Sequence, residues 1–156
     1  MNSIGATIEW NRGEDAFHNN RYSRAHSWRF DGGFEVRASS SPDIVPVPMS
    51  DAKAVDPEEA FVAALSSCHM LWFLSIAAKN GFVIDTYIDH ASGEMRKNAN
   101  GKLIVDVVTL QPDVRWSGDR VPAQEEVMEM HDRAHDECFI ANSVLTKVNI
   151  EPKFMI

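Results

Sequence analysis

The chain contains two cysteines, Cys68 and Cys138, which are 70 residues apart. Two isolated thiols do not make a framework of structural disulfides, and the N-terminus has neither the basic lead-in nor the apolar core of a signal peptide. We therefore expect both cysteines to be reduced thiols in a cytoplasmic protein, where a disulfide between them would be catalytic or regulatory. The sequence predicts that any chemistry in this chain is thiol chemistry at these two positions.

Cys68 lies within an apolar segment but has the polar neighbours Ser66, Ser67 and His69. One interpretation is that Cys68 is a small buried hydrophobe, since free cysteine is among the most buried residue types. The three polar neighbours of Cys68 instead favour a pocket at this point of the segment. His69 follows Cys68 directly and would point about 100° away on a helix, so we do not expect it to deprotonate the thiol. We interpret His69 as a partly buried, hydrogen-bonded histidine.

A second group of ligand-type residues precedes and includes Cys138. His131 and His135 share one face of an expected helix, and Cys138 falls near the same face. Three such residues are a weak indication of a metal site, because a structural zinc site needs a fourth ligand and the chain has no Cys-x-x-Cys pair. We favour a solvated amphipathic helix here and predict no metal.

The element that must position Cys68 is a helix expected over residues 57–80. Asp56 can accept hydrogen bonds from the free N–H groups as the N-cap, and Pro57 suits the first helical position. Glu59 completes a capping box with Asp56, and Gly81 is a suitable C-terminal stop. The helix would be about 36 Å long.

This helix is apolar on nearly all sides, so we expect it to be covered on most of them. Its apolar part, residues 61–78, would span only about 27 Å and contains Ser66, Ser67, His69 and Ser75. We therefore interpret it as a buried core helix and not as a membrane span. A single small domain covers one side of such a helix well, and a second copy of the chain is the simplest cover for the rest.

The remaining segments predict an α+β fold in a single domain over residues 1–156. Strand patterns occur at 6–10 and in a hairpin at 24–38, whose turn is Asp31-Gly32-Gly33. Further strands are expected at 83–91, 102–115 and 144–154, with a second helix from Pro122 to about residue 136. The expected order is β-β-β-α-β-β-α-β.

Length and charge exclude several function classes. The chain has 156 residues, of which 44% are hydrophobic, and a formal net charge of −8 with a pI near 5.1. An acidic chain of this kind lacks the basic face that nucleic acids require and the polybasic patch that binds anionic membranes. We therefore expect neither nucleic acid nor membrane as a partner.

The segment from Asp56-Pro57-Glu58-Glu59 to Cys68 resembles the helix signature of the osmotically inducible protein C (OsmC) and organic hydroperoxide resistance family. Cys138 occupies the position of the second cysteine of that family, just before the final strand. The resemblance covers nearly the whole chain. It implies an OsmC-like fold, an intertwined homodimer with active sites at the interface, and thiol-dependent reduction of organic hydroperoxides.

The resemblance also implies roles for individual residues. Cys68 would be the peroxidatic thiol, Cys138 the resolving thiol and Glu58 the conserved carboxylate that orients an arginine. That arginine lies upstream of the helix in the family, and the candidates here are Arg21, Arg24 and Arg37. One branch carries it where this chain has Pro48. We favour Arg24. A dithiol of the lipoyl type would be the external reductant, and no metal, haem or flavin is implied.

Elementary chemistry agrees with this assignment. Only a thiolate is a useful nucleophile and free cysteine titrates near 8.5, so a nearby cation is needed, and arginine never deprotonates. Glu58 lies ten residues before Cys68, about 15 Å along a helix, so its side chain cannot comfortably meet Cys68 in the same chain. It could meet the Cys68 of a second, antiparallel copy.

Two alternatives remain open at this point. The chain could be a non-enzymatic dimer that senses redox state or binds a small apolar ligand, which predicts an apolar pocket without an arginine within reach of Cys68. It could also be a metal-binding stress protein that uses His131, His135 and Cys138. The peroxidase prediction requires thiols near enough for a disulfide, with Cα atoms roughly 4.4–6.8 Å apart.

Overall fold

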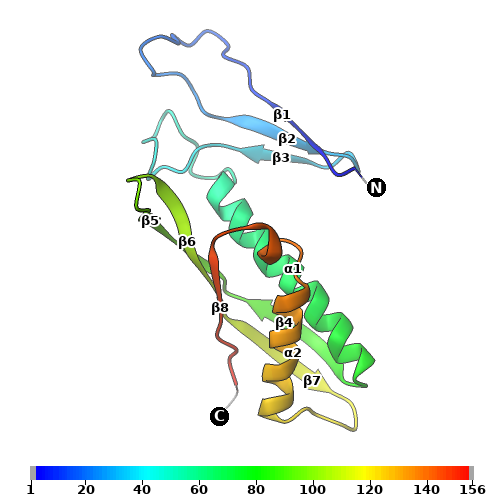
Figure 1. The fold of residues 1–156 in the computed structure, drawn as a ribbon. Helices are drawn as coiled ribbons and strands as arrows, with labels where there is room; N and C mark the ends of the chain where they lie inside the picture. Colours follow the sequence, from blue (N-terminus) through cyan, green and yellow to red (C-terminus); the bar gives the residue numbers. More distant parts are fainter. Residues whose placement is uncertain (1–2, 155–156) are drawn as a thin grey trace. The chain divides into compact units, whose positions relative to one another are not determined.

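The computed structural model describes residues 3–154, which form two compact units (Figure 1). The N-terminal unit ends at Ala60 and the C-terminal unit begins at Phe61. The long helix α1, Pro57–Lys79, begins in the first unit and continues through the second. The α+β class predicted from the sequence is confirmed, with two α-helices and eight strands in the described residues.

The N-terminal unit is built on a three-stranded antiparallel sheet. Its strands are β1 (Ala6–Glu9), β2 (His26–Phe30) and β3 (Glu35–Ala38), in the spatial order β1-β2-β3. The predicted hairpin is confirmed, because β2 pairs with β3 and the turn between them contains Gly33 at a φ of 84°. Glycine suits this left-handed conformation, which a side chain with a Cβ atom rarely adopts.

Helix α1 begins as the sequence predicts. The Asp56 side chain accepts a hydrogen bond from the Glu59 N–H at 2.7 Å, and the Glu59 carboxylate accepts one from the Asp56 N–H at 3.2 Å. This reciprocal pair is the capping box. Among the described helices α1 alone is long and apolar enough to cross a bilayer, a test that core helices of soluble proteins also pass. Its inner face in the C-terminal unit packs in two hydrophobic cores.

The sheets of the C-terminal unit differ in two respects from the predicted strand order, and the first concerns the segment 102–115. The single strand expected at 102–115 is two strands, β6 (Leu103–Leu110) and β7 (Pro112–Ser117). The break falls at Gln111, whose backbone N–H donates to the Asp89 carboxylate at 2.6 Å. Strand β7 pairs with β4 (Val83–Asp89), whereas β6 joins another sheet.

That other sheet contains a strand that the sequence pattern does not reveal. Its order is β5-β6-β8, with β5 at Ser92–Lys97 antiparallel to β6 and β8 at Lys147–Ile150 parallel to it. Strand β5 is exposed along its whole length and has no buried apolar face. Alternation of apolar and polar residues is the usual sequence signal of a half-buried strand, so it is absent here.

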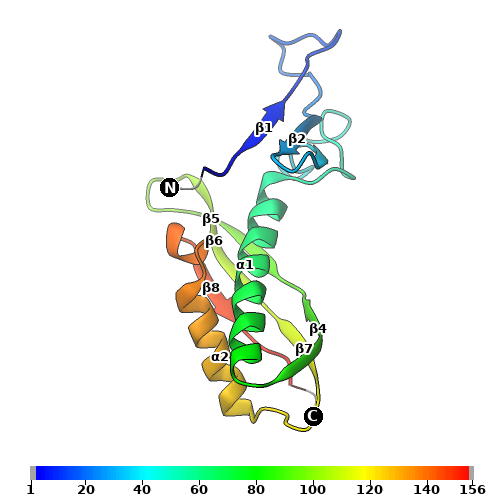
Figure 2. The same cartoon turned by 90° about the vertical axis from the view of Figure 1, so that its right-hand side faces the viewer.

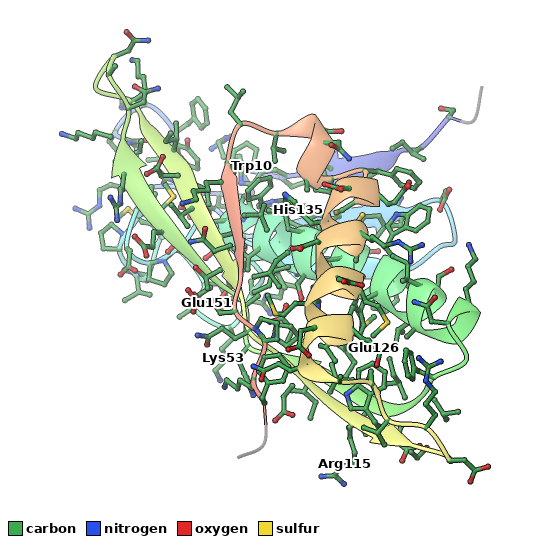
Figure 3. All side chains as sticks on the ribbon, turned by 60° about the horizontal axis from the view of Figure 1, so that its bottom comes forward. Trp10, Lys53, Arg115, Glu126, His135 and Glu151 are labelled. Carbon is green, nitrogen blue, oxygen red and sulfur yellow. The ribbon has the colours of Figure 1, made fainter. Side chains whose placement is uncertain are left out.

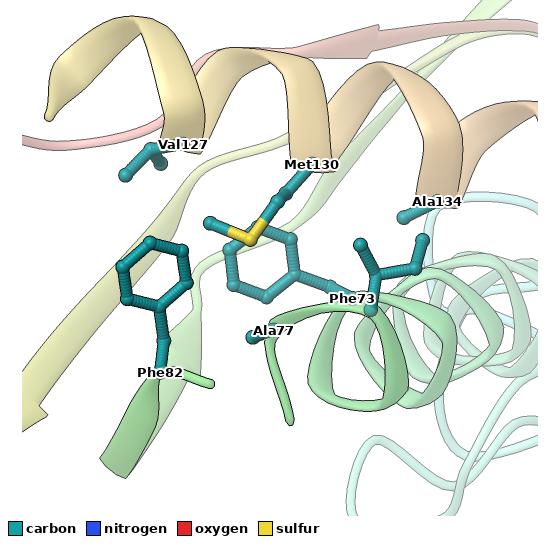
Figure 4. Packing of buried hydrophobic residues seen from close by; sticks show 7 residues of the cluster. Phe73, Ala77, Phe82, Val127, Met130 and Ala134 are labelled. Carbon is teal, nitrogen blue, oxygen red and sulfur yellow. The ribbon is translucent and has the colours of Figure 1, made fainter. Parts of the chain in front are cut away.

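The second helix, α2, spans Gln124–Glu137, close to the predicted segment. It lies beside α1 in both views of the ribbon (Figures 1 and 2). A hydrophobic core joins the two helices, and the close-up shows these side chains facing one another (Figure 4). The buried members of this core are Phe73, Ile76, Ala77, Phe82, Val127, Met130 and Ala134. This core packs α1, which carries Cys68, against α2, which ends just before Cys138.

Candidate active site

The structure brings Cys68 and Cys138 together. Cys68 is half-buried in the middle of α1, and Cys138 is 1% exposed directly after the last residue of α2. Both are free thiols, and Cys68 lies near enough to Cys138 to contribute to the shift in the pKa of its thiol. Residues 70 positions apart in the sequence are therefore neighbours within the C-terminal unit.

The end of α2 holds Cys138 in place through backbone contacts. The Cys138 N–H donates to the His135 carbonyl at 3.2 Å, and the Cys138 carbonyl accepts from the Asn142 N–H at 3.0 Å. The Ala141 N–H also points at the Cys138 sulfur, 3.4 Å away. Backbone contacts of this kind restrain the position of the sulfur more tightly than packing alone.

The two thiols are chemically different. Burial raises the pKa of the Cys138 thiol to about 11, because the thiolate loses its hydration, and the neighbouring Cys68 contributes in the same direction. Cys138 is therefore a protonated thiol at neutral pH. A protonated thiol is a poor initial nucleophile, and it must give up its proton when it attacks a sulfenic acid, whose hydroxyl group can take that proton and leave as water.

We predict that the rate at which iodoacetamide alkylates Cys138 in the folded protein reaches half its maximum only at about pH 11. The reagent reacts with the thiolate, so its rate follows ionisation, and an unperturbed cysteine would reach half its maximum near pH 8.5. Peptide mass spectrometry measures the modification of each cysteine separately. In a Cys68→Ser variant the midpoint for Cys138 should fall, since the contact with Cys68 is one cause of the shift. A Cys138 midpoint near pH 8.5 in the native protein would contradict this.

Cys68 opens into a cavity of about 510 Å³ in the C-terminal unit. Most of its wall is apolar and comes from α1 and from the segment that follows Cys138: Ala64, Leu71, Trp72, Phe139 and Ile140. Trp72 and Phe139 meet edge to face with their ring centres 5.6 Å apart. The polar part consists of Ser67, Ser75 and the thiol itself. Such a lining suits an apolar group that carries a single reactive end.

The N-terminal unit brings together the two other predicted site residues. Arg24 and Glu58 both line a second cavity of about 510 Å³. Its aromatic wall is a cluster of Trp10, Phe17 and Tyr22, in which the rings of Phe17 and Tyr22 stack at 4.8 Å. One carboxylate oxygen of Glu58 is buried and has no hydrogen-bond partner among the described residues. A buried carboxylate oxygen of this kind is available to an incoming donor.

Arg24 is held by its own loop. Its guanidinium donates to the Asn20 carbonyl at 3.0 Å, to the Asn20 side chain at 2.8 Å and to the Tyr22 carbonyl, and it lies 3.8 Å over the Tyr22 ring. Within residues 3–154 it is in no ion pair. Of the other candidates, Arg37 is paired with Asp51 at 2.5 Å, and neither it nor Arg21 lines this cavity. Arg24 is thus the candidate that shares a cavity with Glu58.

The histidines beside the thiols differ from the sequence-based interpretation. His131 is not on a solvated face: it is fully buried, and its Nδ1 lies 2.9 Å from Nε2 of His69, which is 1% exposed. Among the residues that the structure describes, only one nitrogen of His69 has a hydrogen-bond partner, so His69 is not fully satisfied. Burial lowers the pKa of His69 to about 4, with a contribution from His135, and that of His131 to about 3, with a contribution from His69. Both are neutral at pH 7.

The alternative of a metal site gains nothing from the geometry. Within residues 3–154, no three side chains of His, Cys, Asp or Glu lie close enough to share an ion. His135 lies on α2, one turn beyond His131 (Figure 3). The pairing of His131 with His69 was missed because nothing in the spacing of two histidines 62 residues apart indicates contact.

Comparisons with known proteins identify the family to which this chain is related. The family model described as OsmC-like protein matches residues 50–153. An OsmC-like protein of unknown function from Vibrio cholerae is 52% identical, with a TM-score of 0.96 over 98% of this chain and 100% of that one. The organic hydroperoxide resistance protein OhrB of Bacillus subtilis has a TM-score of 0.70 at 18% identity, covering 97% and 98% of the two chains.

A further solved structure has the same fold. An organic hydroperoxide resistance protein from Elizabethkingia anophelis has a TM-score of 0.70 at 16% identity over 97% of this chain and 94% of that one. None of the curated proteins matches the chain. The family match spans more than half of the chain, includes Cys68 and Cys138, and agrees with the fold. The chain therefore belongs to the OsmC-like family.

Proposed function

We propose that the protein is a thiol peroxidase that reduces organic hydroperoxides through Cys68 and Cys138. The observation that carries the proposal is the proximity of the two thiols: Cys68 opens into an apolar cavity, and Cys138 beside it is buried and protonated. Two structural neighbours are named as organic hydroperoxide resistance proteins, which supports the same chemistry. The expected setting is the cytoplasm, where thiols stay reduced.

The reaction has three balanced steps. The Cys68 thiolate attacks the peroxide, so that an S–O bond forms, the O–O bond breaks and the alkoxide leaves as an alcohol after taking a proton. The Cys138 thiol then attacks the Cys68 sulfenic acid: the S–S bond forms, the S–O bond breaks, and the hydroxyl leaves with the thiol proton as water. An external dithiol of the lipoyl type reduces the disulfide and is itself oxidised to a cyclic disulfide. No cofactor takes part in these steps.

We propose that a homodimer completes the site. Leu71 and Phe139, which line the cavity at Cys68, are 61% and 69% exposed, and a second copy would cover them. Glu58 lies ten residues before Cys68 on α1, so the partner subunit is the simpler source of a carboxylate and an arginine at the thiol. In this assignment the cavity of Arg24 and Glu58 supplies the cation that the thiolate requires.

The test is a single turnover in the absence of reductant. One equivalent of cumene hydroperoxide added to the reduced protein should remove two hydrogen atoms from its mass and produce a Cys68–Cys138 disulfide in the peptide map. Dihydrolipoamide should then restore both thiols. Cumyl alcohol, which has the same apolar group without the O–O bond, is the matched control and should leave the thiols reduced. Thiols that stay reduced in the presence of the hydroperoxide would overturn the proposal.

A second function is favoured by one observation. The described residues that line the cavity at Cys68 include no charged side chain, as expected for a site that only binds an apolar ligand. The same experiment separates the two functions. A protein that binds cumyl alcohol, as calorimetry would show, but whose thiols survive cumene hydroperoxide is an apolar ligand-binding dimer and not a peroxidase.

A further inference from the structure

The buried histidine pair connects the same two helices that carry the thiols. His69 on α1 and His131 on α2 meet at 2.9 Å between nitrogens, and their rings lie nearly coplanar and edge to edge, with centres 5.2 Å apart and an interplanar angle of 9°. Phe73 stacks on a face of His131, with ring centres 4.0 Å apart. The pair is thus joined by one N–H···N hydrogen bond, and the ring of Phe73 covers a face of His131.

The pair leaves buried polar atoms without partners. Within residues 3–154, Nδ1 of His69 and Nε2 of His131 have no hydrogen-bond partner, and both side chains are at least 99% buried. Two neutral imidazoles carry two N–H groups, and the shared bond uses one of them. One N–H and one lone pair therefore remain unsatisfied whichever ring donates. A phenylalanine or leucine pair would avoid this cost, so stability alone does not account for two histidines here.

The positions of the contacts on the two helices suggest what the pair does. On α1, Cys68 and Trp72 are one turn apart and meet Cys138 and Phe139. The neighbouring stripe of α1 carries His69 and Phe73, which meet His131. Along α2, positions 131 and 138 are about 10.5 Å apart on nearly the same face. Helix α1 is therefore held at two separate points, and its rotation about its own axis is fixed by both.

We propose that His69 and His131 are positioning residues that hold the Cys68 sulfur opposite Cys138. The hydrogen bond is directional, whereas apolar contacts in the adjoining core allow a helix to rotate slightly or slide. Loss of the bond frees α1 to turn, and a turn that moves the sulfur by about 1 Å is enough to slow a reaction between fixed groups by up to a hundredfold. The inference rests on the proposed function, since it concerns the disulfide step.

The experiment compares two substitutions of His131. His131→Phe keeps the ring that stacks on Phe73 but has no nitrogen, and His131→Asn places an amide where Nδ1 lies, so that the bond to His69 is retained. His90→Asn is the matched control, because His90 is an exposed residue of the same unit. The readouts are the rate at which the Cys68 sulfenic acid closes to the disulfide after one equivalent of cumene hydroperoxide, and the reduction potential in a dithiol buffer.

We expect closure in His131→Phe to be about tenfold to a hundredfold slower than in the native protein, while His131→Asn stays within about threefold and His90→Asn is unchanged. If His131→Phe does not fold, the same comparison is made at the other ring with His69→Leu and His69→Gln, because a glutamine amide replaces Nε2. Native closure rates and potentials in a folded variant without the bond would overturn the inference, and so would a slow Asn or Gln variant. A native protein that forms no disulfide at all would instead contradict the proposed function.

Discussion

Replacement of Cys68 by serine is expected to reduce the consumption of cumene hydroperoxide by about a thousandfold or more. A serine hydroxyl in the same cavity keeps the shape of the site but is not a nucleophile at neutral pH, and no described side chain in the lining of this cavity other than Cys68 carries a thiol. Steady-state consumption in the presence of dihydrolipoamide measures the effect. Both folded proteins should bind cumyl alcohol, which separates loss of chemistry from loss of the cavity.

The companion variant Cys138→Ser is expected to behave differently. Cys138 is buried and protonated, so it does not make the first attack, and Cys68 should still consume one equivalent of peroxide. The sulfenic acid at Cys68 then has no thiol to condense with and should accumulate. Its reaction with dimedone would give an adduct that reveals it. If Cys138→Ser failed to consume the first equivalent of peroxide, as Cys68→Ser should, the order of attack assigned to the two sulfurs would be wrong.

The parts of the fold that local sequence signals determine could be predicted. Asp56, Pro57 and Glu59 specify the start of α1, and the observed capping box uses the predicted atoms. The turn at Gly33 likewise follows from a conformation that glycine adopts readily. In each case the determining residues lie within a few positions of one another, so their effect does not depend on the rest of the chain.

Features that depend on distant parts of the chain were predictable only in part. Strand β5 is held by pairing with β6 and not by burial, so its polar sequence carries no strand signal. The family motif placed Cys68 and Cys138 at one site, because it encodes a tertiary contact. Nothing equivalent marks His69 and His131: a histidine on a helix is compatible with solvent, a metal or the core, and only the packing of α1 on α2 decides among them.

The same buried pair predicts a marked loss of stability in acid. His69 and His131 have pKa values lowered to about 4 and about 3, mainly because burial removes the hydration of the charged form. The unfolded chain takes up these protons near pH 6.5 and the folded chain does not. The stability that the neutral rings contribute is therefore fully present above pH 6.5 and is lost as the pH falls from 6.5 toward 4 and 3.

By pH 4 this loss amounts to roughly 3 kcal/mol for each histidine, against the 5–15 kcal/mol that folded domains usually have in total. Urea denaturation at pH 7 and pH 4 measures this loss of unfolding free energy. Carboxylates that titrate in the same range contribute equally in every variant, so their contribution cancels when variants are compared. In His131→Asn one of the two titrations is gone, so the acid-induced loss should be smaller than in the native protein by roughly 3 kcal/mol, whereas His90→Asn should lose as much as the native protein does. An equal loss in all three proteins would mean that the rings are hydrated and titrate as they do in the unfolded chain. That outcome would also remove the rigid contact between α1 and α2 from which we infer the alignment of the two thiols.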